Sequence, residues 1–571
     1  MNKNKCVYLH AKLKLYLFYM KRLFTLTIAV LLTFTLHAQS FESATEAVKN
    51  MGVGWNLGNT LEAFNSNGSR QGLESEIYWG APYTEPKLMH MMKDAGFGAI
   101  RVPVTWMNHM DANGKVDEDW MNRVRTVVDY VLDAGMYCIL NVHHDTGSGN
   151  VHWLHANMST YNSCRSKYEY LWQQIATTFK DYDQRLLFES YNEMLDKYNS
   201  WCFATFNSSS KYIAADAADA YEAINNYAQS FVTTVRGTGG NNAKRNLVVN
   251  TYGACNGSGT WNSHLQDPLK EMKMPSDPAG AGHIAFQVHT YPDISNLNNA
   301  KNEVTQMFSL LNNHLVSKGG PVIVGEWGTS NVDAAISDYD ADRAKYLDFV
   351  TFFVKKAKEG GFGLFYWMGI SNGSDRSIPV FSQADLAQTM IEAYHGTTDG
   401  FVYPSRDDLG PSVYEVSYNS QWGELNLIGS AIKTADYSRL ELELAEKPAT
   451  GLLQFKVYPA EKNYAINASS NTLNFNTSTM GATINRVTMQ SSSATAKVTV
   501  KSVTLVKTDG TKYTQVVSPF WGCSVKESFT TGINTVRTNT PASNVFYNLQ
   551  GQRVTPRKGI YIHNGRKVII K

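Results

Sequence analysis

Short apolar runs alternate with amphipathic stretches along the first 400 residues of this chain. The apolar runs are typical of buried β-strands. We expect eight of them, ending at Asn56, Pro103, His143, Asn192, Tyr252, His289, Glu326 and Trp367. The stretches between them are typical of helices. Residues 119–134, for example, carry valines at helical spacing and are followed by Gly135, a common helix C-terminal signal.

Strands that alternate with helices predict a parallel sheet covered by helices. Eight such units over residues 39–400, the last helix lying near 385–395, predict a closed (β/α)8 barrel with loop insertions at 146–168 and 194–215. An open doubly wound sheet is the alternative. It is disfavoured because no glycine-rich phosphate loop follows the first strand.

The pattern changes after residue 400. Residues 413–528 are rich in alternating strands, which predicts an all-β sandwich; examples are 424–429, 439–444, 496–506 and 512–517. Segments 401–412 and 529–543 are rich in Gly, Thr, Pro, Ser and Asn and are predicted linkers. The last segment, 544–571, predicts a small β tail, and it looks like the C-terminal tails of exported proteins, some of which serve in sorting.

The first 38 residues have the order of a secretory signal peptide. Lys21 and Arg22 precede an apolar segment, 23–36, and the small residue Ala38 follows. Met20, just before the basic pair, is an alternative start of the chain. A membrane anchor is the alternative, but the apolar core of about 14 residues is shorter than the roughly 20 that a span needs. We therefore expect an exported protein with no stable membrane insertion.

The charge and the cysteine content of the chain argue against a nucleic-acid-binding protein and against a disulfide-stabilised fold. Removing residues 1–38 takes away six basic residues and no acidic one, and leaves 46 basic against 50 acidic residues. This balance gives no reason to expect nucleic acid as a partner. The five remaining cysteines are sparse and odd in number, so they predict no disulfide framework. One bridge, Cys164 to Cys202, is conceivable but cannot be deduced from the sequence.

Two predicted strands end in a carboxylate. Residues 186–194, LLFESYNEM, end in Asn192 and Glu193, and residues 321–328, PVIVGEWG, reach Glu326. Side chains at the C-terminal ends of barrel strands meet at one mouth. A pair of carboxylates there fits glycoside hydrolysis, which needs one acid for the leaving oxygen and one carboxylate at the anomeric carbon. The pattern alone does not tell which is which.

Other polar residues near these strand ends have less specific meanings. Glu189 lies four residues before Glu193, deeper in the strand, so a supporting role is expected for it. A metal site is the alternative use of a group of neighbouring ligand-type residues, His143, His144, Asp145, His152 and His155. Their spacing repeats no known ligand motif, and we expect neither a metal nor a cofactor.

Several motifs in the same order identify a resemblance. The segments are GWNLGNTLEA (54–63), YWGAPYT (78–84), AIRVPVTW (99–106), NVHHD (141–145), FESYNE (188–193), HTY (289–291), GEWG (325–328) and Trp367. Together they resemble glycoside hydrolase family 5, the cellulase family of clan A, and most closely its subfamily 4. The resemblance covers the whole predicted barrel.

The resemblance implies a role for each matching residue. Glu193 would be the acid/base and Glu326 the nucleophile of a retaining reaction, with carboxylates about 5 to 5.5 Å apart. The supporting residues would be Arg101 as a donor near Glu326, Asn192 on the sugar 2-hydroxyl, His143 facing the mouth with His144 beside it, His289 in a subsite, Tyr291 on the nucleophile and Trp367 under the sugar. Thr290 stands where the family often has an aromatic residue.

Further aromatic residues are candidates for sugar contacts. In the barrel they are Trp79, Trp106, Trp153, Trp261 and Trp327, for outer subsites. In the sandwich, which resembles carbohydrate-binding modules in size and placement, they are Trp422, Tyr437, Phe520 and Trp521. Aromatic residues are equally common in protein cores, so each of these assignments has a purely structural alternative.

The resemblance implies an exported, retaining endo-β-1,4-glucanase that acts as a monomer on polysaccharide. A xyloglucanase or a mannanase/glucomannanase on the same barrel is the enzymatic alternative. A non-catalytic glycan-binding surface protein is the alternative from another class, and the presence of both Glu193 and Glu326 disfavours it.

Overall fold

The computed structural model describes residues 41–201, 211–258, 264–330, 336–429 and 431–529, and in the tail 546–547, 553–554, 559–563 and 566–570. The predicted leader at 1–38, Cys202, Trp261 and nearly all of the predicted linker 529–543 lie outside these residues. Within the described ranges, no helix combines the length and the apolar character that a membrane crossing requires.

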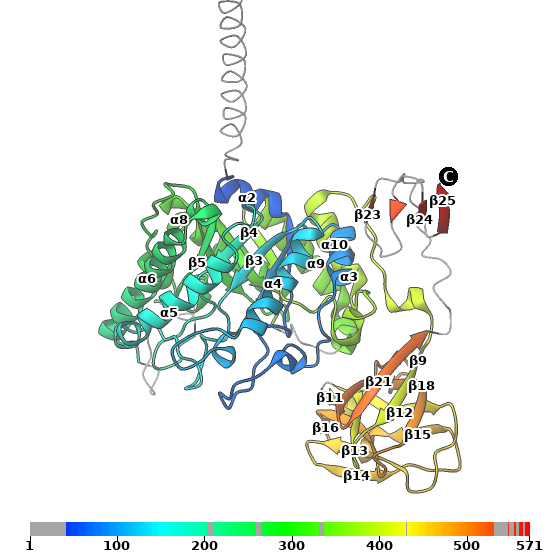
Figure 1. Cartoon of the computed structure of the whole chain (residues 1–571). Helices are drawn as coiled ribbons and strands as arrows, with labels where there is room; N and C mark the ends of the chain where they lie inside the picture. The colour runs from blue at the N-terminus through cyan, green and yellow to red at the C-terminus, as the bar shows by residue number, and fades with distance from the viewer. Residues whose placement is uncertain are drawn as a thin grey trace, which may run out of the picture. The chain divides into compact units, whose positions relative to one another are not determined.

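Eight parallel strands close into a barrel in sequence order, as predicted. They are β1 (Val53–Asn56), β2 (Ala99–Val102), β3 (Tyr137–Asn141), β4 (Leu186–Glu189), β5 (Leu247–Asn250), β6 (Ile284–Thr290), β7 (Val322–Trp327) and β8 (Gly363–Tyr366). Figure 1 shows helices outside these strands, and they are α3 (Pro86–Asp94), α4 (Glu118–Asp133), α5 (Met158–Thr178), α6 (Ala214–Gly237), α7 (Asp267–Glu271), α8 (Leu297–His314), α9 (Ile336–Gly360) and α10 (Ala384–His395).

Three of the strands are two or three residues shorter than the sequence suggests. β3 ends at Asn141 and not at His143, β4 ends at Glu189 and not at Asn192, and β5 ends at Asn250 and not at Tyr252. The residues between the observed and the predicted strand ends belong to loops at the mouth of the barrel. The predicted insertion at 146–168 is also partly wrong, because α5 begins at Met158 with its N-terminus capped by Asn157.

The barrel interior is built in layers. Its apolar layer has one side chain from each of seven strands, all fully buried: Ala99, Ile139, Leu187, Val248, Ala285, Ile323 and Phe365. The helix α2 (Ala44–Met51) packs against this layer. At the place of Gly54 on β1, an added Cβ would meet the Phe365 ring at 2.4 Å, so only glycine leaves that ring its room.

A polar layer follows two residues later on the same strands. Because side chains alternate along a strand, residues two apart face the same way. The layer is fully buried and consists of Asn56, Arg101, Asn141, Glu189, Asn250 and Gln287. β7 has Gly325 at this level, where an added Cβ would lie 2.2 Å from the Gln287 amide carbon. This buried polar floor lies directly beneath the mouth of the barrel.

The C-terminal region is all-β, as predicted. One antiparallel sheet has the order β14-β13-β17-β10-β20, and a second has the order β15-β12-β18-β9-β21, with β19 paired to β18. The strands of the first sheet are β10 (Glu424–Ile428), β13 (Leu453–Tyr458), β14 (Lys462–Ala465), β17 (Arg486–Ser491) and β20 (Ser518–Trp521). Those of the second are β9 (Ser412–Tyr418), β12 (Tyr437–Leu444), β15 (Thr472–Asn476), β18 (Lys497–Lys507), β19 (Lys512–Thr514) and β21 (Cys523–Phe529).

Both sheets contribute to one apolar core, which makes the region a sandwich. Leu440 and Leu442 from the second sheet and Phe455 from the first belong to the same buried cluster. Tyr437 is buried in this core too, so its proposed place on an exposed stacking face is wrong. In the tail, four short strands form a further sheet: β22 (Phe546–Tyr547), β23 (Arg553–Val554), β24 (Gly559–His563) and β25 (Arg566–Ile570).

Four cysteines lie within the described residues. Cys138, Cys164, Cys255 and Cys523 form no disulfide. The Sγ of Cys164 lies 3.0 Å from the hydroxyl of Tyr227. The conceivable bridge between Cys164 and Cys202 involves Cys202, which lies outside the described residues.

Candidate active site

Arg101, on β2, is the centre of the polar floor. Its Nε and Nη2 donate to the two carboxylate oxygens of Glu189 at 2.7 and 2.8 Å, and its Nη1 donates to Glu326 Oε1 at 2.8 Å. Arg101 and Glu189 have no exposed surface. A bidentate pair of this kind fixes the guanidinium plane. Glu189 is thereby occupied with holding Arg101, which agrees with the supporting role expected for it.

Glu326, at the end of β7, accepts hydrogen bonds on both oxygens. Tyr291 donates its hydroxyl to Oε2 at 2.8 Å, and His289 Nδ1 lies 3.5 Å from the same oxygen. Burial alone would raise the pKa of Glu326. The nearby His289 and Arg101 and the Tyr291 hydroxyl outweigh burial, so the pKa lies below its ordinary value. Glu326 is therefore held as a carboxylate.

Glu193 stands in the loop after β4 and has the opposite setting. Its side chain is 22% exposed, and its Oε1 lies 2.8 Å from His289 Nδ1. Burial, together with the negative charge of Glu326, raises the pKa of Glu193 in spite of the His289 contact. One oxygen of Glu193 lies within 4.8 Å of one oxygen of Glu326. Two neighbouring carboxyl groups with pKa values shifted in opposite directions can act as an acid and a nucleophile.

Asn192 and His143 complete the polar contacts around Arg101 and Glu326. The Asn192 Oδ1 accepts from Arg101 Nη2 at 2.8 Å, and its Nδ2 lies 3.3 Å from His143 Nε2. His143 Nδ1 lies 3.0 Å from Asn141 Nδ2. Burial lowers the pKa of His143 well below its ordinary value. A neutral His143 thus sits 3.9 Å from the Glu326 carboxylate without adding a charge to it.

Aromatic rings continue the site outward. The Trp367 indole is parallel to the His143 imidazole, with centroids 5.9 Å apart. His144 meets His143 edge-on at 4.6 Å and packs against Phe64 at 5.1 Å and Trp79 at 5.4 Å. Burial lowers the pKa of His144 to about 3, so this ring too is neutral. The result is a row of flat, uncharged rings, with Trp79 exposed at its outer end.

Not every predicted tryptophan faces this row. Trp106 and Trp327 are fully buried; Trp106 donates to the Asn141 carbonyl, and Trp327 stacks on Phe353 at 4.2 Å. Both belong to the core, so their proposed subsite roles are wrong. Trp153 donates to Asp145 at 2.6 Å and packs against the core. Of the described barrel tryptophans proposed for outer subsites, Trp79 is the one with a large exposed surface.

The structure brings the predicted site residues together. Arg101, His143, Asn192, Glu193, His289, Tyr291 and Glu326 are joined by hydrogen bonds or close polar contacts, and Trp367 and His144 join through their rings. No specific role is predicted from the sequence for Asn56, which accepts from Arg101 Nη1 at 3.0 Å and donates to the Gly325 carbonyl at 2.9 Å. A signal is nevertheless present, because Asn56 ends an apolar strand, as Glu189 does.

The candidate metal ligands around His143 have other partners. Asp145 accepts from Trp106 N and Trp153 Nε1, His152 Nδ1 contacts the His144 carbonyl, and His155 Nε2 contacts the His152 carbonyl. Glu193, His289 and Glu326 are close enough to share an ion, with ligand atoms within 4.8 Å of one another. Glu193, His289 and Glu326 are the same hydrogen-bonded residues that form the candidate active site, so they do not make up a separate cluster.

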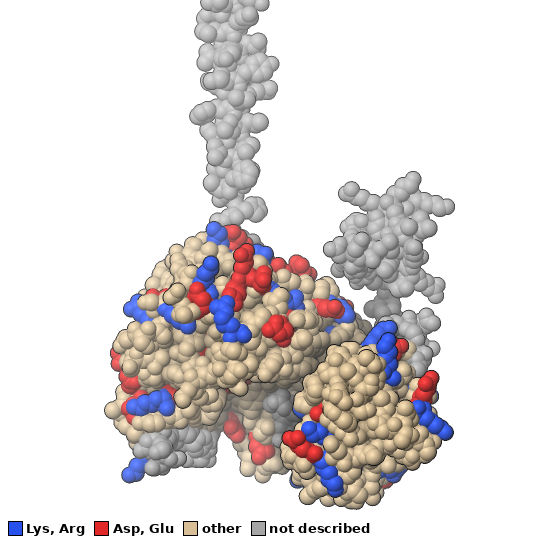
Figure 2. Space-filling view, turned by 60° about the horizontal axis from the view of Figure 1, so that its bottom comes forward, with Lys and Arg blue, Asp and Glu red and all other residues tan. Residues whose placement is uncertain are grey.

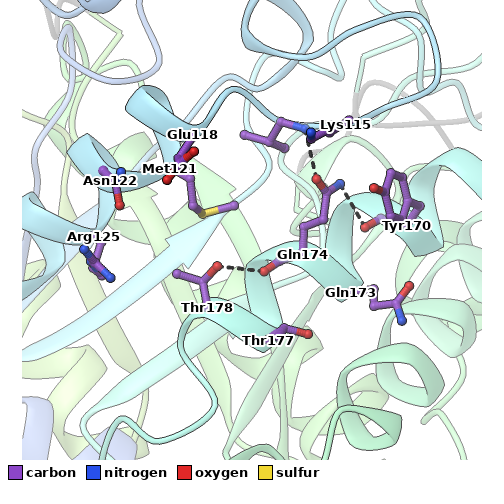
Figure 3. Close-up of a pocket in the computed structure, with 11 residues that line it drawn as sticks. Lys115, Glu118, Met121, Asn122, Arg125, Tyr170, Gln173, Gln174, Thr177 and Thr178 are labelled. Carbon is purple, nitrogen blue, oxygen red and sulfur yellow. Dashed lines mark hydrogen bonds between the residues drawn. The ribbon is translucent and has the colours of Figure 1, made fainter.

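Two surface features lie outside this site. A cavity of about 600 Å³ is lined by α4 and α5 on the outside of the barrel (Figure 3). Its Gln174 accepts from Val116 N and donates to the Gly114 and Tyr170 carbonyls, so this amide is used within the fold. On the face shown in Figure 2, basic and acidic side chains are scattered among uncharged ones and are not gathered by sign.

Comparisons with known proteins point to one family. The family described as cellulase (glycosyl hydrolase family 5) matches residues 58–373. "Endoglucanase A" of Clostridium longisporum is 34% identical over 348 residues, which are 58% of this chain and 60% of that protein. "Endoglucanase B" of Ruminococcus albus is 34% identical over 334 residues, 55% of this chain and 73% of that protein. The chain thus spans less than two thirds of the Clostridium protein.

Solved structures agree with these matches. A GH5-4 broad specificity endoglucanase from an uncultured bacterium is 56% identical and covers 63% of this chain and 98% of its own, with a TM-score of 0.61. A family 5 enzyme from Prevotella bryantii B14, in complex with a xyloglucan tetradecasaccharide, is 41% identical and covers 62% and 99%, with a TM-score of 0.55.

Proposed function

The chain belongs to glycosyl hydrolase family 5, the cellulase family, and from this premise we propose that it is a retaining endo-β-1,4-glucanase acting on β-glucan backbones. The observation that carries the proposal is the pair Glu193 and Glu326, within 4.8 Å of each other and with pKa values shifted in opposite directions. Retaining glycosidases hold their carboxyl groups about 5–5.5 Å apart, whereas inverting ones need roughly 6.5–9.5 Å to admit a water.

In the first step, the Glu326 carboxylate attacks the anomeric carbon while Glu193 gives its proton to the glycosidic oxygen. The C–O bond to the leaving sugar breaks, and a glycosyl ester of Glu326 forms. The low pKa of Glu326 supports its role as nucleophile, and the raised pKa of Glu193 supports its role as acid. Tyr291 and Arg101 hold the carboxylate for attack.

In the second step, Glu193 acts as a base. Esterification removes the negative charge of Glu326, which is one cause of the raised pKa of Glu193. The pKa of Glu193 therefore falls in the intermediate, and its carboxylate can take a proton from the water that attacks the anomeric carbon. Two inversions at that carbon give net retention. The second step restores both groups to their starting protonation.

The remaining site residues bind the sugar in this proposal. Asn192 is held by Arg101 beside Glu326, where an amide can reach the 2-hydroxyl. Trp367 offers a flat face to the sugar at the cleavage point, and the row through His144 to Phe64 and Trp79 extends the contact along the chain. An extended row of rings favours endo action on a polymer.

Two relatives support the proposed substrate range. One is named a broad specificity endoglucanase, and another was solved with a xyloglucan fragment. We infer that this chain takes unbranched β-glucans and also xyloglucan. No cofactor enters the mechanism. Export stays an expectation drawn from the leader sequence, and the monomeric state stays one that the family resemblance implies.

Two measurements test this function. Proton NMR during hydrolysis of a cello-oligosaccharide is expected to show the β-anomer of the product first, and initial release of the α-anomer would contradict retention. Reducing-sugar release from carboxymethylcellulose, lichenan, xyloglucan and glucomannan then ranks the substrates. Activity confined to glucomannan would replace the glucanase assignment with a mannan-directed one.

A further inference from the structure

The outward face of the β14-β13-β17-β10-β20 sheet differs from an ordinary solvated sheet face. Strand register places its residues in rows: Tyr458 pairs with Arg486, Lys456 with Thr488, and Gln454 with Gln490. The rows continue onto β10, where Asn426 pairs with Thr488 and Glu424 with Gln490. The residues between them, such as Phe455 and Met489, belong to the core. A continuous polar face thus covers this side of the sandwich.

Glu424 is the centre of the hydrogen-bond network on this face. It is buried, and its carboxylate accepts from Thr488 at 2.7 Å, Tyr458 at 2.9 Å and Gln490 at 3.1 Å. Lys456 Nζ lies 3.8 Å from the same carboxylate and 3.0 Å from Glu461. Such a network holds each side chain in one rotamer, as a preorganised binding face requires.

Exposed aromatic side chains on the edge strand β20 lie beside this hydrogen-bonded network. Phe520, on the edge strand β20, is 41% exposed, and its ring lies 6.3 Å from the Tyr458 ring. The Arg486 guanidinium carbon lies 3.9 Å from the centroid of the Phe520 ring. Trp521, next along β20, pairs in register with Glu424 and is 48% exposed. Large exposed rings in one small region usually indicate a binding surface.

Two further observations point to a ligand. Within the described part of the sandwich, Arg486 Nε and Asn426 Oδ1 are buried atoms without a hydrogen-bond partner, a donor and an acceptor on the same face. Trp422, another exposed ring two residues before Glu424, has a φ of 64°, which is unfavourable for a bulky residue. Unpaired polar atoms and backbone strain both cost stability, and they cluster where a protein binds something.

We propose that this face, with Phe520 and Trp521 as its rings and Arg486 and Asn426 as its polar contacts, is a second binding site for a β-glucan chain. The charges on the face balance, two basic side chains (Lys456, Arg486) against two acidic ones (Glu424, Glu461), which suits a neutral ligand. Sugar rings present C–H faces to aromatic rings and hydroxyls to donors and acceptors. The choice of β-glucan rests on the proposed function of the barrel.

The test uses the full chain made inactive by Glu326→Gln and measures its retardation in native gels that contain xyloglucan, lichenan or alginate. Adding Phe520→Ala or Arg486→Ala is expected to weaken binding to at least one neutral glucan about tenfold, the scale of losing one well-placed anchor. Arg439→Ala is the matched control, because Arg439 lies on the other sheet and pairs with Glu441 at 2.7 Å. Circular dichroism confirms that each variant is folded.

Each outcome decides the proposal. Retardation that changes no more in Phe520→Ala and Arg486→Ala than in Arg439→Ala overturns it, as does binding of alginate in preference to both neutral glucans. The two proposals also fail separately. A chain with intact Glu326 that releases no reducing sugar from any glucan, while Phe520→Ala still weakens retardation, refutes the barrel's function alone. Hydrolysis together with unchanged retardation refutes the sandwich site alone.

Discussion

The mouth of the barrel and the outer face of the sandwich both hold a buried carboxylate in a hydrogen-bonded network, but with different partners. Glu326 is fixed by the cation Arg101 and by Tyr291, and a second carboxyl group lies within 4.8 Å. Glu424 accepts its hydrogen bonds from the neutral donors Thr488, Tyr458 and Gln490, and the cation Lys456 lies farther off, 3.8 Å from the carboxylate. In the mouth, close charges move pKa values apart and so make acid and nucleophile. On the sandwich, neutral bonds only set the positions of side chains. The first arrangement suits a reaction and the second suits binding.

Removing the nucleophile should have the largest effect. Glu326→Gln keeps the shape of the side chain but cannot form a glycosyl ester, so kcat on a soluble β-glucan should fall by about five orders of magnitude. Initial-rate assays of reducing-sugar release measure it. Glu169→Gln, a half-buried carboxylate on α5 that pairs with Arg165 outside the barrel mouth, is the matched control. Residual activity above about 1% of wild type would exclude Glu326 as nucleophile.

Removing the acid/base should cost less and depend on the leaving group. Glu193→Gln should lower kcat/KM on a glucan by roughly 10²–10⁴-fold, the usual contribution of general acid–base catalysis. An aryl glycoside with an acidic phenol leaves without protonation, so its glycosylation step should be affected far less. Added azide should restore turnover of that substrate and give a β-glycosyl azide. Equal losses on both substrates would contradict the assignment of Glu193.

Weakening the hold on Glu326 should shift the pH profile. Tyr291→Phe removes a hydrogen bond of 2.8 Å to the carboxylate, which should raise the pKa of Glu326 and lower kcat by roughly 10–100-fold. The nucleophile must be ionised, so the acid limb of the kcat/KM profile should move to higher pH. Tyr182→Phe, which loses a 2.7 Å bond to Asp129 on the outer helices, is the control. An unmoved acid limb would show that Tyr291 does not act on Glu326.

Much of the barrel can be predicted because its signals are local. An apolar strand that ends in a carboxylate is visible in eight residues, and this is enough to pair Glu193 with Glu326 from the sequence alone. Glu189 can also be placed deeper than Glu193 from its position in the chain. The lengths of β3 and β4 cannot be predicted, because the loop residues after them are as buried as a strand's. In the sequence, the buried loop residues that follow these strands are therefore indistinguishable from further strand residues.

The other features that could not be predicted from the sequence depend on contacts between segments that are distant in the chain. Trp106 and Trp327 are large and apolar, and nothing in their neighbourhood tells a core ring from a subsite ring. Phe520 and Arg486 meet only because β20, β10 and β17 are adjacent in one sheet, and strand order in a sandwich is not encoded locally. Nothing in the sequence around Trp422 indicates its positive φ.

The neutral network of the sandwich can be tested by an isosteric change. Glu424→Gln turns one acceptor oxygen into an NH₂ group that faces the donors Thr488 and Gln490. A buried group left unpaired costs about 1–3 kcal/mol, so thermal denaturation should show a Tm of the sandwich lower by roughly 4–12 °C. Glu443→Gln, an exposed carboxylate on β12, is the control. An unchanged Tm would mean that Glu424 does not organise the face.

The same isosteric change in the mouth should have the opposite and smaller effect. The folded-state pKa of Glu193 is raised by burial, so the stability that this carboxyl contributes is present below its unfolded pKa and is lost as pH rises through the folded pKa. Above that pH, wild-type protein holds an ionised Glu193 at a cost that Glu193→Gln does not have. Its Tm should therefore exceed that of wild type by about 1–2 °C at pH 8, and the difference should shrink toward pH 4. We thus expect the catalytic carboxyl group of Glu193 to lower the stability of the fold at pH 8, and the carboxylate of Glu424, which positions its neighbours, to raise it. A Glu193→Gln protein with a Tm below that of wild type at pH 8 would contradict this difference.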